Sequence, residues 1–311
     1  MYFPYLRCKQ FELLALREIS PYLIGSKKIS PVLEPVKKST IALVKALDSL
    51  VTFNINFNLI INPAHGEFVD NTSGIISILN AQLIAYQNFQ LAIIINQFTN
   101  LDYITGQLQQ IEFERPITLI HQGRLNDIDA LARWCLDYDI KYNLYAENFP
   151  VRRYRGIITP NTKVLLDDKF KPQVKNADYL INPDEFFSED HIYFAEDGFQ
   201  GFGDYLTIGD DYAESGWLPY AVAIHFTYVK ENNEIWIKHF VSDSNNDSTD
   251  VAGKFGEALD KLIEFITLQN ITTDAANEFR RLHSNGHYPG LGTLKKLSIK
   301  NHIELVHNLL G

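Results

Sequence analysis

Short apolar runs alternate with longer amphipathic stretches over the first half of the chain. An apolar strand at residues 2–6 is followed by charged residues, an amphipathic helix, and a second strand at 29–33 that ends on Glu34. The same pattern predicts strands at 57–61, 91–95, 116–120, 142–146 and 163–166, and helices at 40–50, 74–86, 101–109 and 127–138. Successive strands begin roughly 22–34 residues apart, which is the size of one β/α unit.

Seven such units predict an α/β fold, a TIM-like (β/α)8 barrel, rather than an open doubly wound sheet, which is the main alternative. No glycine-rich phosphate loop follows the first strand, as a dinucleotide-binding open sheet would require. The strand at 91–95 is almost wholly aliphatic, as expected where both faces of a parallel sheet are covered. Residues 204–208 are either the eighth strand or part of a long loop over the barrel.

The regular rhythm stops after residue 168. Residues 182–216 are rich in acids, glycine and aromatic residues. Alternating stretches at 220–229 and 234–241, joined by a turn at 231–233, predict a β-hairpin. Helices are predicted at 251–268, 274–282 and 299–309. Because no long Pro/Gly/Ser linker occurs, we expect one domain, with β/α units over 1–180, a Gly/aromatic loop and hairpin over 181–250, and C-terminal helices over 251–311.

Composition narrows the partners that we expect. The chain has 28 basic and 38 acidic residues, a net charge of -10, which disfavours non-specific binding to nucleic acid or anionic membranes. Cys8 and Cys135 are too few for a disulfide framework or a structural zinc site. We find no signal-peptide pattern, and the apolar runs are shorter than the ~20 residues of a membrane span. A cytoplasmic protein without a membrane partner is therefore predicted.

Charged residues follow several predicted strands, at the edge where parallel β/α folds bind ligands. Lys9, Glu34 and Glu147 are the candidate catalytic residues, which would orient a substrate or transfer a proton. Asp168, with Glu34 and Glu147, could hold a divalent metal ion through oxygen ligands. The alternative for Asp168 is that it stabilises a helix N-terminus.

Histidines supply further candidates. His65 and His121 each follow a strand and are candidates for acid/base or ligand-binding roles, as is Gln97 at the tip of the fourth strand. His225 and His239 lie on the two hairpin strands, so their rings could face each other if these residues pair directly. That arrangement favours packing or hydrogen bonding over a metal pair.

The segment DGFQGFGDY, residues 197–205, has two alternative interpretations. Its glycines permit close backbone approach and its aromatic rings could stack on a planar ligand such as a base, which predicts a lid with Asp197, Asp204 and Tyr205 as binding residues. Otherwise the loop fills the barrel with its own aromatic side chains. Arg153 lies in a basic cluster, which either binds phosphate or is a solvated loop. The absence of HExxH, CxxC and GxSxG disfavours zincin, redox and serine-hydrolase mechanisms.

Two N-terminal segments resemble the bacteriophage beta-protein family and its bacterial relatives. The residues that match are Pro4, Leu6, Lys9 and Glu12 in the first segment and Pro31, Leu33, Glu34 and Pro35 in the second. The segments 197–205 and 223–228 (AIHFTY) are also similar to the family's downstream pattern, whereas Cys8 stands where glycine or another small residue is expected. The resemblance implies a barrel-like domain associated with phage, mobile elements or defence loci, and it supplies no catalytic residues.

Two hypotheses follow. The first is a cytosolic barrel enzyme that acts on a phosphate-bearing ligand, such as a nucleotide. Its cofactor is unknown and could be a divalent metal. The second is a non-enzymatic subunit that binds a protein partner in a phage-related or defence complex. An enzyme requires the polar side chains at the strand ends to converge, whereas a subunit can leave them dispersed.

Overall fold

The computed structural model of the chain describes residues 1–214 and 219–311, so the last two residues of the acidic and aromatic stretch 182–216 lie outside the described residues. The chain forms two compact units. The first comprises Met1–Leu13, Ser20–Asp167 and Asp190–Asp204, and the second Leu14–Ile19, Asp168–Glu189 and Tyr205–Gly311. The second unit thus takes in three separate segments of the chain.

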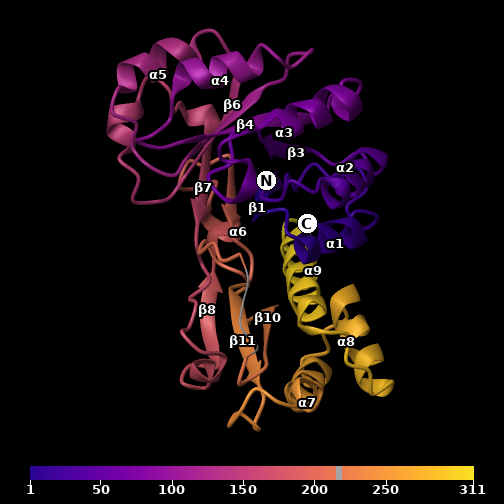
Figure 1. Cartoon of the computed structure of the whole chain (residues 1–311). Helices are drawn as coiled ribbons and strands as arrows, with labels where there is room; N and C mark the ends of the chain where they lie inside the picture. The colour runs from indigo at the N-terminus through magenta and orange to yellow at the C-terminus, as the bar shows by residue number, and fades with distance from the viewer. Residues whose placement is uncertain (215–218) are drawn as a thin grey trace. The chain divides into compact units, whose positions relative to one another are not determined.

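The first unit contains a closed barrel of eight parallel strands, which confirms the TIM-like architecture (Figure 1). Its strands are β1 (Tyr2–Leu6), β2 (Val32–Leu33), β3 (Phe57–Ile60), β4 (Phe89–Ile95), β5 (Ile117–His121), β6 (Ile140–Tyr145), β7 (Lys163–Asp167) and β9 (Gly201–Asp204). They are neighbours in this order, and β9 closes the barrel by pairing with both β7 and β1.

Helices follow the first five strands. They are α1 (Gln10–Ile19), α2 (Ile41–Thr52), α3 (Ser73–Ile78) with the π-helical turn η2 (Leu79–Leu83), α4 (Leu101–Leu108) and α5 (Ile128–Cys135). Figure 1 shows α2 to α5 on the outside of the barrel strands. Asn100 and Asp127 cap α4 and α5 by accepting backbone N–H groups of the first turn. After β6 the connection consists of the 3-10 turns η3 (Val151–Tyr154) and η4 (Pro160–Thr162).

The eighth barrel strand is β9, so the first alternative for residues 204–208, the eighth strand, was wrong by several residues. Its two glycines are required by packing, because a Cβ atom at Gly201 or Gly203 would overlap the backbone of the β1 region. Phe202 is buried and stacks on Tyr2, with ring centroids 5.3 Å apart. Residues 201–204 therefore form the barrel wall and are neither a lid nor a plug.

Hydrogen bonds inside the barrel identify which side chains face its interior. Thr118 Oγ1 on β5 donates to Asn58 Oδ1 on β3 at 2.6 Å, across the intervening β4, so both side chains point inward. Val32 is the register partner of Asn58 and of Tyr5 and shares this face. By strand alternation, Glu34 at the end of β2 also faces the barrel axis.

The second unit is built on a three-stranded antiparallel sheet, in the order β10 (Ala223–Val229), β11 (Ile235–Val241) and β8 (Asp184–Ser188). The predicted hairpin is confirmed as β10–β11. Helices α7 (Val251–Leu268), α8 (Asp274–Ser284) and α9 (Leu291–Leu309) complete the unit, and their apolar residues share one core with Ile224, Phe226 and Phe240 of the sheet.

The short helix α6 (Asp190–Tyr193) and the 3-10 turns η1 (Gly66–Phe68) and η5 (Asn176–Leu180) lie in connecting segments. Within the described part of the chain, none of the helices combines the length and apolar character needed to cross a membrane.

Candidate functional site

Glu34 is the centre of a polar cluster at the carboxyl end of β1, β2 and β3. Its carboxylate is fully buried, and Oε1 accepts the backbone N–H groups of Ala64 at 2.9 Å and His65 at 3.1 Å. The ring Nδ1 of His65 lies 3.2 Å from the same oxygen. Oε2 accepts the hydroxyl of Tyr5 at 2.9 Å and lies 3.6 Å from Nε of Arg7.

These contacts determine the charge of Glu34. Burial raises the pKa of the carboxyl group, but the hydrogen bond and charge of His65, the Tyr5 hydroxyl and the Arg7 charge together outweigh it and lower the pKa. The group is therefore ionised at neutral pH, and both of its oxygens are occupied by donors. An anion held in this way positions its neighbours more effectively than it accepts a proton.

His65 is the group of the cluster that is best placed to transfer a proton. When its Nδ1–H donates to Glu34, the ring is fixed in the tautomer that leaves Nε2 as the acceptor. A carboxylate plays the same orienting part for the histidine in Ser-His-Asp triads. The His65 side chain remains 32% exposed, so a ligand can reach it.

The loop that carries His65 is shaped by the following residue. Gly66 has φ +79, and a Cβ atom there would overlap the backbone of Val36. Glycine alone fits this close approach, which brings the loop after β3 against the end of β2.

Cys8 and Glu12 lie beside this cluster. Burial and the charges of Glu12 and Glu34 raise the pKa of the Cys8 thiol well above its ordinary value, so the thiol is a poor nucleophile. Cys8 also has φ 51, a left-handed conformation that glycine adopts at least cost.

The structure brings Glu34 and His65 together, but it disperses other predicted residues. Lys9 is half-buried directly before α1. Gln97, Glu147 and Arg153 are exposed, in the connections after β4 and β6. Because β6 is four strands from β2 in either direction, Glu147 follows a strand on the opposite side of the barrel from Glu34.

The metal interpretation gains no support from the structure. Asp168 is exposed, and its carboxylate accepts the backbone N–H groups of Phe170 at 3.1 Å and Asp210 at 2.8 Å, which organises a turn. Across residues 1–214 and 219–311, no group of three or more His, Cys, Asp or Glu side chains is arranged to hold a metal ion. Asp168, Glu34 and Glu147 are thus not assembled as a ligand set.

The remaining predicted residues have local roles. Asp197 is exposed in the turn before β9, and Tyr205 is buried. Asp204 is buried and accepts the Tyr2 hydroxyl at 2.8 Å; burial and the Asp204 charge raise the pKa of Tyr2 well above its ordinary value.

His121 lies within β5 rather than beyond it. Its Nε2 is 2.8 Å from Asn143 Oδ1, and the rings of Phe149 and Tyr154 pack at 5.2 and 5.3 Å. Burial lowers the pKa of His121 to about 4, so the ring is neutral at physiological pH. His121 is a buried structural residue of the barrel wall.

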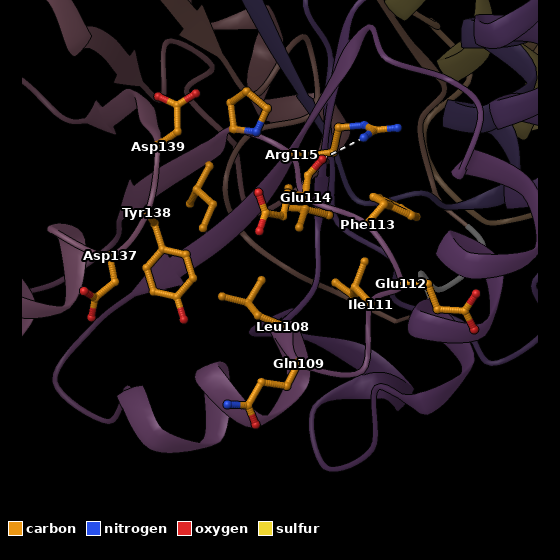
Figure 2. A pocket seen from close by; sticks show the side chains of 13 residues that line it. Leu108, Gln109, Ile111, Glu112, Phe113, Glu114, Arg115, Asp137, Tyr138 and Asp139 are labelled. Atoms are coloured by element: carbon orange, nitrogen blue, oxygen red, sulfur yellow. Dashed lines mark hydrogen bonds between the residues drawn. The ribbon is translucent and has the colours of Figure 1, made fainter.

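A surface pocket of about 650 Å³ lies at the opposite, amino-terminal end of the strands, near the ends of α4 and α5. Figure 2 shows Asp137, Tyr138 and Asp139 on one side and Phe113 and Arg115 on the other. Arg115 is held by backbone carbonyls of residues 84, 86 and 114. The pocket contains none of the predicted site residues, and we place the candidate site at Glu34 and His65, where polar groups converge at the end of the barrel used for catalysis.

Tyr5 and Arg7 were missed as site residues. Arg7 lies in the charged segment after β1, and the sequence pattern predicted a role for neither side chain. The signal that could have found them is alternation, because residues 5 and 7 share the face of β1 that points toward the barrel axis.

Comparisons with models of protein families, with curated proteins and with solved structures find no match. Any inference about function therefore depends on the residues and their geometry.

Proposed function

We propose that this protein is an enzyme that transfers a proton at the carboxyl end of its barrel. His65 is the group that accepts or donates the proton, and Glu34 is the positioning residue that fixes its tautomer. The observation that carries this proposal is that one buried carboxylate binds both the ring Nδ1 and the backbone N–H of His65. General acid–base catalysis of this kind contributes roughly 10²–10⁴-fold to a rate.

The substrate that we propose is a phosphate-bearing ligand such as a nucleotide. Two cations, Arg7 and Lys9, follow β1 at the same end of the barrel and favour an anionic ligand. Arg153 and Gln97 belong to loops at this end and would contact the ligand from the β4 and β6 side. In this proposal Glu147 is a binding residue rather than a partner of Glu34 in catalysis.

We also infer membership of the bacteriophage beta-protein family, with a cytoplasmic location and a phage-related or defence role. The support is positional, because the two segments that carry the resemblance form β1, the beginning of α1 and β2, and so supply Glu34 and its neighbours.

A ligand screen tests the proposal. Purified protein is melted with inorganic phosphate, pyrophosphate and a panel of nucleotides, each with and without divalent metals. A ligand at 100 times its Kd adds about 2.7 kcal/mol to the stability of the folded state. Conversion of any stabilising ligand is then measured in wild type, His65→Gln and His283→Gln. His283 is a matched control, because it also pairs with a carboxylate, Asp260, at 2.9 Å on the surface of the second unit.

We expect His65→Gln to fold normally and to lose at least about 100-fold in turnover, and His283→Gln to behave as wild type. Equal turnover in all three proteins would refute the role of His65. A screen without any stabilising ligand would favour the non-enzymatic subunit that binds a protein partner.

A further inference from the structure

A second chain of titratable groups crosses the sheet of the second unit. His225 on β10 and His239 on β11 are register partners, and their Nδ1 atoms are 2.8 Å apart. Nε2 of His239 lies 3.2 Å from Oε1 of Glu185 on β8. Each strand of the sheet thus contributes one residue to a continuous series of hydrogen bonds.

The chemistry of the three groups determines where the protons lie. Glu185 also accepts from Lys171 Nζ at 3.1 Å and Asn182 Nδ2 at 3.3 Å, which is the environment of a carboxylate. His239 must therefore donate from Nε2, so its Nδ1 is the acceptor when the ring is neutral. His225 then donates from Nδ1, and its Nε2 carries the lone pair.

The surroundings leave that last nitrogen as the end of the chain. His239 is fully buried, whereas His225 is only partly buried. Phe170 and Tyr179 pack against His225 at 5.1 and 4.6 Å, and no hydrogen-bond partner for its Nε2 is found in the part of the chain that the structure describes.

Charged neighbours favour neutral rings. Burial, the charge of His239 and that of Lys295 on α9 lower the pKa of His225 to about 3. Burial lowers the pKa of His239 as well, although Glu185 and Asp184 act in the opposite direction.

We propose that Glu185, His239 and His225 form a hydrogen-bonded relay that presents Nε2 of His225 as an acceptor site for a ligand with a hydroxyl group. The site lies entirely within the second unit and is independent of the barrel site. The ligand's hydroxyl group donates a hydrogen bond to Nε2 of His225 and keeps its proton, because the lowered pKa values of His225 and His239 make both rings weak bases.

The ligand's hydroxyl group completes the series of hydrogen bonds. With a donor at Nε2 of His225, all four ring nitrogens of His225 and His239 have hydrogen-bond partners.

Nitrogen NMR of the imidazole rings in the full chain tests the assignment directly. At neutral pH we expect His225 to be protonated at Nδ1 and unprotonated at Nε2, and His239 to be protonated at Nε2. His283 is the internal reference, because its Nε2 is bonded to Asp260. A His225 ring protonated at Nε2 would overturn the proposal.

Reactivity toward diethyl pyrocarbonate tests the acceptor site. The Nε2 lone pair attacks a carbonyl carbon of the reagent, an N–C bond forms, and an ethyl carbonate group leaves. We expect His225 to be modified in wild type and in His283→Gln, and at least 10-fold more slowly in His239→Asn, in which an amide replaces the basic nitrogen that takes up the Nδ1 proton.

A second variant guards against loss of folding in His239→Asn. In Glu185→Gln the amide oxygen still accepts from His239, but the charge that favours protonation of His239 in acid is gone. The relay should then keep its tautomers and take up its proton at a lower pH than wild type. If proton uptake is unchanged in Glu185→Gln, or if His225 is not modified in wild type, the proposal is wrong and the three residues have only a structural role.

Discussion

At the scale of single residues, the candidate site is held together by the need to satisfy a buried carboxylate. An ionised Glu34 without partners would cost several kcal/mol in a barrel interior. Its donors come from β1 and from the loop after β3, so the requirement for hydrogen bonds fixes the positions of Tyr5 and His65. Position after a strand was enough to predict Glu34 and His65 from the sequence. It could not show that Glu34 holds His65, because that contact depends on how the loop at Gly66 folds back.

Cys8 offers a test at the same scale. At most positions a protein with glycine is less stable than the same protein with alanine. The φ of 51 at Cys8 reverses this order. Because an L-residue in this conformation costs about 1–2 kcal/mol, we expect Cys8→Gly to be more stable than Cys8→Ala by about 1 kcal/mol. Urea unfolding of the two variants measures the difference, and both lose the same thiol. A more stable alanine variant would contradict the left-handed backbone at this residue.

At the scale of elements, strand β9 shows why the eighth strand could not be located from the sequence. Glycine has a low strand propensity, and residues 201–204 alternate glycine with other residues, which suggested a loop. The segment is a strand because β1 and β7 offer it hydrogen bonds on both sides, and only glycine permits that approach. Strands such as the aliphatic β4 could be predicted from their own residues. β9 could not, because it forms a strand only through its pairing with β1 and β7.

The packing of β9 predicts a pair of opposite effects. A methyl group at Gly203 would overlap the Phe3 carbonyl and lie 3.1 Å from its Cβ, so we expect Gly203→Ala to destabilise the barrel by about 2–3 kcal/mol. Gly256 in α7 has nothing within 4 Å of the corresponding position. Gly256→Ala should stabilise the second unit by up to about 1 kcal/mol, because alanine is the better helix former. Thermal unfolding of both variants measures these effects. If Gly203→Ala leaves the stability unchanged, β9 does not pack closely against β1.

At the scale of the whole molecule, both units bury neutral histidines, and this makes stability depend on pH. Burial lowers the pKa of His121 in the barrel to about 4, that of His225 to about 3, and that of His239 below its ordinary value. In the unfolded chain each titrates near 6.5. Between these values the unfolded state binds more protons than the folded state. Stability is therefore complete above about pH 6.5 and falls as the pH drops toward the folded pKa values.

The change of the unfolding free energy with pH can be assigned to single residues. From pH 6.5 to pH 5, His121 alone should remove about 2 kcal/mol from the stability of the barrel, at 1.36 kcal/mol for each pKa unit. His121→Gln retains an amide that can bond to Asn143 but cannot titrate. Its unfolding free energy, measured in urea at pH 7, 6 and 5, should therefore fall less steeply than that of wild type. Glu34 does not enter this window, because its lowered pKa contributes stability above about pH 4.5 that is lost only at lower pH.

The control for this experiment is His283→Gln, because His283 is an exposed histidine in the second unit. It should reproduce the wild-type pH dependence, while His121→Gln should make the pH dependence shallower. If the two variants show the same slope, His121 is not buried as a neutral ring, and the packing of β5 against η3 would differ from that described here. If only His121→Gln is shallower, the acid sensitivity of the barrel originates in a histidine of its wall, and the proton chemistry of His65 can be measured at pH 6.5 and above without loss of folding.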